Sequence, residues 1–107
     1  MQQRPITSFE KDLIQHLIEL IPNNLKEYQI PSFVQPLDDG GMGSLQLNKD
    51  SFGQDLVQVQ YKDNDGQQVF ITLVEGQTGV LFELDIWKVD FSPLLVYPTI
   101  DKVGPVV

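Results

Sequence analysis

Cysteine is absent from this 107-residue chain, and histidine and tryptophan occur once each. Disulfides, thiolate nucleophiles and cysteine-bound metals are therefore excluded, and a zinc site would depend on carboxylates, which zinc seldom favours. No run of 18 apolar residues is present, so we expect no membrane span. The first residues, MQQRPITSFEKD, lack the apolar segment of a signal peptide. These absences favour a cytoplasmic protein without a metal or another cofactor.

Basic residues are also scarce, because 15 acidic side chains face 7 basic ones and the formal net charge is −8. Such a surface repels phosphate backbones, so we expect no nucleic-acid partner. It would speed the encounter with a basic protein, although net charge also serves solubility alone. The length suits one domain, residues 1–107, and the 41% of apolar residues can form a core.

The first predicted element is a helix over residues 8–21. Thr7 and Glu10 form a T-x-x-E capping box, and Pro22 ends the helical pattern. Leucine and isoleucine recur at helical spacing and form one apolar stripe. We expect this stripe to pack on a sheet through three leucines: Leu13, Leu17 and Leu20.

Four strands are predicted in the rest of the chain, at residues 44–48, 56–61, 69–75 and 81–91. The segment KDNDGQ (62–67) is typical of a hairpin, and GQTG (76–79) of a second turn, because Asp, Asn and Gly tolerate positive φ. Such short connections favour antiparallel pairing, since parallel strands need long crossovers. The predicted fold is α+β, with the N-terminal helix packed on an antiparallel meander of about four strands.

The last predicted strand, LFELDIWKVDF (81–91), changes the phase of its apolar residues between Ile86 and Trp87. A β-bulge would produce this change, because an inserted residue re-aims every side chain after it. The alternative is that the strand ends near Ile86 and the remainder packs irregularly. Trp87 can accordingly fill the core or form a surface anchor, and fluorescence would separate the two.

The glycine-rich segment DDGGMGS (38–44) matches neither phosphate-loop nor dinucleotide-binding spacing, so it is predicted to be a turn entering a strand. The segment DNDG (63–66) lacks the acidic ligands that a calcium loop needs at its ends. The alternating acids Glu83 and Asp85 fit a carboxylate pair or simply the solvent side of a strand. We therefore assign no catalytic, cofactor-binding or metal-binding residue.

Three stretches resemble a known family: RPITSFEKDLIQHLI, PLDDGGMGSL and LFELDIWKVDFSPL, in that order along the chain. The family consists of small bacterial proteins and is catalogued as a domain of unknown function. The resemblance covers most of the chain and implies a stand-alone, single-domain, cytoplasmic bacterial protein. It supplies no functional residues. The size and acidity are also similar to those of toxin-neutralising immunity proteins.

Three classes of function remain. The first is a non-enzymatic protein-binding module, for example an immunity-type inhibitor of a basic partner. The second is a small enzyme or metal-binding protein that uses Glu83, Asp85 and Asp90. The third is a structural subunit of a homo-oligomer, with Leu56, Phe70, Val74 and Leu81 on a sheet face that the helix leaves uncovered. The predicted partner-binding residues are Asp38, Asp39, Gly40, Gly41, Met42, Glu83, Asp85, Trp87 and Asp90.

Overall fold

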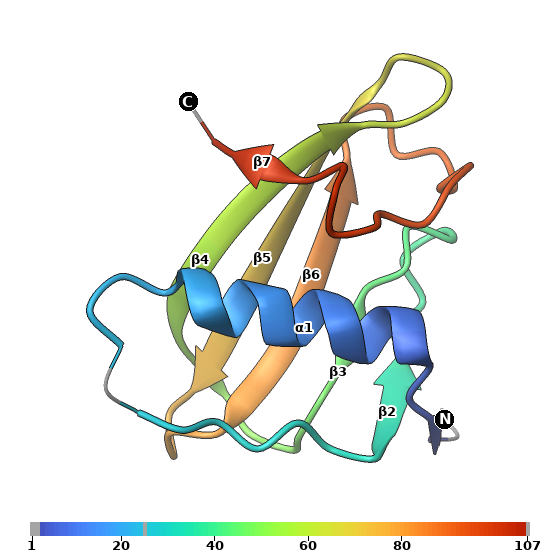
Figure 1. The fold of residues 1–107 in the computed structure, drawn as a ribbon. Coiled ribbons are helices and arrows are strands. Elements are labelled where there is room, and N and C mark those ends of the chain that lie inside the picture. Colours follow the sequence, from blue (N-terminus) through green and yellow to red (C-terminus); the bar gives the residue numbers. More distant parts are fainter. Residues whose placement is uncertain (1–2, 25, 107) are drawn as a thin grey trace.

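The computed structural model describes residues 3–24 and 26–106, in which one helix lies across one face of an antiparallel sheet (Figure 1). This arrangement confirms the predicted α+β class. The helix is α1 (Ser8–Leu20), and the long strands are β4 (Phe52–Lys62), β5 (Gln68–Gly76) and β6 (Leu81–Lys88). The short strands are β1 (Arg4–Pro5), β2 (Phe33–Pro36), β3 (Leu45–Gln46) and β7 (Gly104–Pro105). In the described part of the chain, no helix has the length and apolar character needed to cross a membrane.

Helix α1 begins at the predicted capping box. The Thr7 hydroxyl accepts a hydrogen bond from the Glu10 backbone N–H (3.1 Å), and the Glu10 carboxylate accepts one from the Thr7 N–H (2.9 Å). The same carboxylate accepts two bonds from the Arg4 guanidinium, at 2.9 and 2.7 Å. The box thus satisfies N–H groups that a helix end leaves unpaired, and it ties β1 to α1.

The apolar stripe of α1 is buried over its first three turns. Leu13, Ile14 and Leu17 are fully buried, whereas Leu20 is 45% exposed. Leu20 thus lies at the rim of the helix–sheet contact, beside Val57 and Val59 of β4, and is not buried there as Leu13 and Leu17 are. Figure 1 shows that α1 ends at the β4 side of the sheet, where few elements remain to cover its last turn.

The sheet has seven strands in the order β1-β2-β3-β6-β5-β4-β7, and all neighbouring pairs are antiparallel. Strands β4, β5 and β6 form the predicted meander. Strand β3 does not precede β4 in space but pairs with β6, where Leu45 lies opposite Leu84. The prediction of about four strands was too low, because the three unpredicted strands have two to four residues, too few to show alternation.

The core lies between α1 and one face of the three long strands. Alternate residues of each strand point toward the helix, as the two-residue period of a strand requires. The register of the β5–β6 ladder shifts once, between Val74 and Glu75, where Phe82 is the additional residue on β6. The buried residues that these strands contribute to the core cluster are Val59, Tyr61, Val69, Ile71, Leu73, Leu81, Leu84 and Ile86.

Candidate partner-binding surface

From Glu83 to Lys88, strand β6 alternates without interruption, and this places Trp87 outside the core. Trp87 lies opposite Phe70 and Lys88 opposite Val69, with no inserted residue. The predicted bulge between Ile86 and Trp87 is therefore wrong. The phase change in the sequence has another cause: Lys88 is fully buried on the helix side, and Trp87 is 46% exposed on the other side. Each residue occupies the environment expected of the other.

The face of the sheet turned away from α1, here called the outer face, carries Glu83, Asp85 and Trp87 at alternate positions of β6. Phe70 of β5 lies beside them, as predicted for the uncovered face. Val74 lies in the row of Glu83 but is only 1% exposed. Leu81 was placed on this face by the sequence analysis, but it belongs to the core cluster, and Leu56 is half-buried against that cluster.

Three aromatic side chains, Phe70, Trp87 and Phe91, form an aromatic cluster at one end of the outer face. The Trp87 and Phe70 rings are stacked, with centroids 5.6 Å apart and planes inclined by 25°. Phe91 is tilted against Trp87 at 6.3 Å and is 67% exposed. Its φ of 62° lies in the left-handed region, which a bulky residue rarely adopts, so the turn after β6 holds an exposed aromatic ring at a conformational cost.

Glu83 and Asp85 form a half-buried carboxylate pair next to this cluster. Positions two apart on a strand put their Cα atoms about 6.7 Å apart on one face. Val74 of β5 and Gln46 of β3 lie opposite Glu83, and Thr72 of β5 lies opposite Asp85. The ion pairs among the described side chains use Arg4, Lys26 and Lys88, each with other carboxylates, so none of them neutralises the pair.

Both carboxyl groups of the pair have raised pKa values, which favour one proton on the pair at neutral pH. Burial, followed by the charge of Asp85 and a hydrogen bond to it, raises the pKa of Glu83 to about 7. Burial also raises the pKa of Asp85, and the charges of Asp55 and Asp39 add to that rise. Two carboxylates that cannot both ionise without a countercharge hold one proton between them.

The DDGGMGS segment runs along the edge of β6 beyond β3. The Ser44 hydroxyl donates to the Ile86 carbonyl oxygen (3.2 Å) and accepts from the Ile86 N–H (2.9 Å). The Lys88 N–H donates to the Met42 sulfur at 3.3 Å. Side chains thus satisfy backbone groups that an additional strand would otherwise pair, and the loop closes this edge against further strands.

The remaining loop residues serve the shape of the loop. The Asp39 carboxylate accepts from the backbone N–H groups of Met42 (3.1 Å) and Ser44 (2.9 Å), which fixes the turn. Gly40 and Gly41 have φ of 77° and 85°, a conformation that favours glycine. Gly40 lies next to the Phe91 backbone, so the loop borders the aromatic cluster.

Two predicted acidic residues stand apart from the carboxylate pair. Asp90 is exposed and accepts from the backbone N–H (3.1 Å) and hydroxyl (2.7 Å) of Ser92, and these bonds lower its pKa. Asp38 is exposed in the loop. The structure therefore brings Glu83, Asp85 and Trp87 together and borders them with the 39–42 turn, while Asp90 shapes the turn that follows β6.

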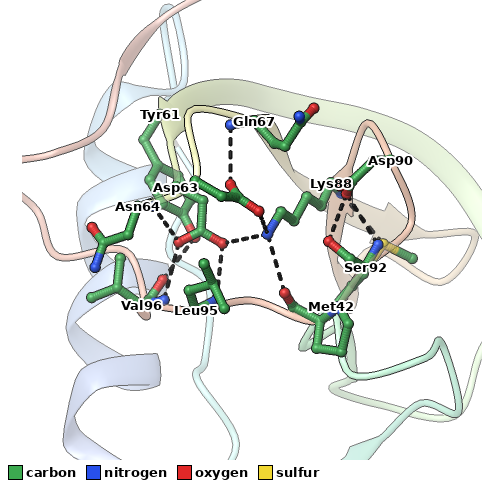
Figure 2. A network of polar contacts seen from close by, with 12 residues as sticks. Met42, Tyr61, Asp63, Asn64, Gln67, Lys88, Asp90, Ser92, Leu95 and Val96 are labelled. Carbon is green, nitrogen blue, oxygen red and sulfur yellow. Dashed lines mark hydrogen bonds and ion pairs between the residues drawn. The ribbon is translucent and has the colours of Figure 1, made fainter.

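The sequence analysis missed an ion-pair network on the helix side of the sheet (Figure 2). The Lys88 ammonium donates to Asp63 Oδ2 (2.9 Å), Asp65 Oδ2 (2.7 Å) and the Pro93 carbonyl oxygen (3.2 Å). The side chains of Lys88 and Asp63 are fully buried. The Asp63 carboxylate also accepts from the backbone N–H groups of Leu95 (2.9 Å) and Val96 (3.1 Å).

This network holds Lys88 inside and thereby Trp87 outside. Burial alone would raise the pKa of Asp63, but the Leu95 N–H and the Lys88 ammonium outweigh it and bring the pKa to about 2. Burial alone would lower the pKa of Lys88, but its bonds to Asp65 and Asp63 raise it. Asp63 and Asp65 lie in the hairpin that sequence reasoning interpreted only as turn chemistry. The sequence did contain a sign of this network. Lys88 follows Leu84 and Ile86 at every second position of the strand, so regular alternation predicts that it is buried and needs an acidic partner.

The fold and the surface define an α+β protein of one helix on an antiparallel sheet, with an outer face that carries aromatic and acidic side chains. The chain belongs to the family described as Domain of unknown function (DUF6984), whose model matches residues 3–98. The predicted resemblance to a family of unknown function is thereby confirmed. No curated protein and no solved structure matched the chain.

Proposed function

We propose that the protein is a non-enzymatic binding module that docks a basic protein on the outer face of its sheet, in a bacterial cytoplasm. The observation that carries this proposal is the position of Trp87. Its indole is 46% exposed, is stacked on Phe70 and lies two positions from Asp85 on the same strand face. Tryptophan is enriched among the residues that dominate binding energy, and contiguous exposed apolar side chains, here Trp87 with Phe70 and Phe91, are typical of an interaction site.

The charge of this surface supports a basic partner rather than a second copy of the chain. Glu83 and Asp85 lack a countercharge among the described side chains, and the whole chain carries a net charge of −8. A second copy would bring the same carboxylates against them, and like charges in contact disfavour association. An inhibitor of a basic toxin, as in immunity proteins, is one form that such a module takes.

The proposal is tested by affinity capture from a lysate of the source organism, followed by titration of the captured protein in purified form. We expect a basic partner whose Kd rises at least tenfold with Trp87→Ala, because that change removes the anchor. Asp12→Asn is the matched control, since it removes an exposed carboxylate from the helix layer and should leave the Kd within about twofold.

Two other results would contradict the proposal. A partner that binds Trp87→Ala as tightly as the natural protein would place the docking surface elsewhere. A dimer in light scattering that dissociates in Trp87→Ala would assign the outer face to a second copy. In the free protein we expect Trp87 emission near the solvent value and ready quenching by acrylamide, because the indole is half-exposed.

A second candidate, acid–base catalysis, is favoured by the pKa of Glu83 of about 7, which puts a proton donor beside an acceptor at neutral pH. It ranks below binding because the pair lies on an open sheet face and Asp90 is engaged with Ser92. Hydrolysis of a model glycoside or ester that Glu83→Gln abolishes would reverse this order.

A further inference from the structure

Resting on the proposed docking surface, we propose that this surface recognises an arginine side chain of the partner, with the guanidinium against the Trp87 indole and the carboxylates of Glu83 and Asp85. The inference is carried by the geometry of the outer face, where an indole and two carboxylates stand at alternate positions of one strand.

Part of the indole is open to a planar cation. Phe70 occupies one side of Trp87 in a stacked arrangement, and Phe91 touches it at an inclination of 51°, yet nearly half of the residue remains exposed. Positions two apart on a strand have Cα atoms about 6.7 Å apart on one face, so a guanidinium against the exposed part of the indole is within reach of the Asp85 carboxylate. Arginine stacks on aromatic faces and donates in a fork, whereas lysine is a strongly hydrated point charge.

The charged groups around the pair are all acidic. Asp85 is exposed to the charges of Asp55 on β4 and Asp39 in the loop, and its neighbour on β5 is Thr72. The neighbours of Glu83 are Val74 on β5 and Gln46 on β3, neither of which ionises. The described lysine and arginine ion pairs lie elsewhere. A proton is therefore the group that relieves the repulsion in the free protein, and an incoming guanidinium takes over that role.

Exchange of a cation for a proton makes the affinity depend on pH. Because the pKa of Glu83 is about 7, the pair holds its proton below neutral pH and must release it when the cation binds. The Kd should then rise tenfold for each pH unit below 7 and level off above 7. Between pH 8 and pH 5.5 the expected weakening is roughly 30-fold.

The test uses two blocked peptides, N-acetyl hexa-arginine amide and N-acetyl hexa-lysine amide, whose charges stay constant from pH 5.5 to 8. Their Kd values are measured at fixed ionic strength by calorimetry, which also applies to Trp87→Ala. Titrations in two buffers of different ionisation enthalpy count the released protons. We expect tighter binding of the arginine peptide, release of up to one proton near pH 6, and the roughly 30-fold pH dependence.

Variants show whether the pH dependence of binding comes from Glu83 and Asp85 or from the overall negative charge of the chain. Glu83→Gln should lose most of the pH dependence while still binding, and Asp12→Asn should keep it. Asp85→Asn, which removes the carboxylate beside the indole, should weaken binding at every pH. Carbon-detected NMR of the Glu83 carboxyl group in the free protein gives an independent reading and should show titration near pH 7.

The outcomes distinguish this inference from the proposed function. Binding that depends on Trp87 but is independent of pH would overturn the proton exchange and leave the docking surface standing. Equal affinity for both peptides would overturn the recognition of arginine. Binding that does not change with Trp87→Ala at any pH would overturn the inference and the proposed docking surface together.

Discussion

Two adjacent residues, Trp87 and Lys88, exchange the environments that their side chains usually occupy. Burial of an ammonium group is costly unless it is paired, and here two aspartates and a carbonyl oxygen receive it. Because successive side chains of a strand point to opposite faces, a buried Lys88 obliges Trp87 to point outward. The ion-pair network on one side of β6 therefore presents the proposed anchor on the other.

Removal of the buried ammonium should destabilise the fold strongly. Lys88→Met leaves the buried carboxylate of Asp63 without its cation, and the uncompensated charge opposes folding. Lys62→Met is the matched control, since Lys62 is an exposed lysine at the end of β4, next to Asp63 in the sequence. In urea denaturation we expect the loss of unfolding free energy for Lys88→Met to be several times that of the control. Equal losses of unfolding free energy in the two variants would show that the buried ion pairs do not stabilise the fold.

Glu83→Gln should stabilise the protein at pH 8 and have little effect at pH 5. Burial raises the pKa of Glu83 from 4.5 to about 7, so between these values the folded state binds more protons than the unfolded state. Stability contributed by the protonated form is therefore lost as the pH rises through this window. Neutral glutamine avoids the loss, and we expect a gain of about 2–5 °C in Tm at pH 8. A gain of the same size at pH 5 would contradict the shared proton.

At the scale of the element, α1 shows how a helix can follow its sequence pattern and still lose part of its packing. The stripe of Leu13, Leu17 and Leu20 lies on one side by helical spacing. The sheet, however, covers only the part of α1 that crosses it (Figure 1). Leu17 is consequently fully buried and Leu20 is 45% exposed, although the two residues are chemically identical.

This difference gives a matched pair of variants. Leu17→Ala opens a cavity in the core and should cost about 2–5 kcal/mol of unfolding free energy. Leu20→Ala removes a half-exposed side chain and should cost about 1 kcal/mol or less. Chemical denaturation of both variants measures the difference directly. Similar losses would mean that the last turn of α1 is covered in solution.

At the scale of the molecule, ion pairs join irregular segments to helix and sheet and also reinforce the contact of β6 with the β4–β5 hairpin. Arg4 ties β1 to α1, and Lys26 ties the segment after α1 to Glu75 of β5, at 2.9 Å. Lys88 ties β6 to the β4–β5 hairpin, and the backbone N–H groups of Leu95 and Val96 bring the following segment to Asp63. The chain thus joins its irregular segments to the sheet without disulfides.

We predict that chelation leaves the fold intact. The described residues include no group of three or more His, Cys, Asp or Glu side chains arranged to hold a metal ion. The core and the ion pairs should therefore supply the stability, and the Tm in excess EDTA should equal the Tm without it. A clear fall in Tm, reversed by adding back a divalent cation, would contradict this prediction and draw attention to the carboxylate pair.

The sequence was sufficient for features that depend on neighbouring residues. The capping box of Thr7 and Glu10 joins residues three apart, and the KDNDGQ hairpin depends on residues that accept turn conformations. Both were predicted correctly, as were the helix, the β4–β6 meander and the α+β class. From the sequence, Glu83, Asp85 and Trp87 were grouped only by their nearness along the chain, and the preferred bulge would have turned Trp87 toward the core; unbroken alternation instead places all three on one face.

Only the tertiary structure decided which face that is. The helix-side position of Lys88 depends on Asp63 and Asp65, which lie more than 20 residues earlier in the chain and approach it only when β4, β5 and β6 pair. Two arrangements give the same apolar pattern in the sequence: a bulge after Ile86, or a regular strand with Lys88 buried and Trp87 exposed. The aspartates that bind Lys88, far away in the sequence, decide for the second. The sequence alone determined that an indole and two carboxylates share one strand. The packing of the hairpin against β6 decided that Trp87 faces outward, because a buried ammonium requires its partners on the helix side.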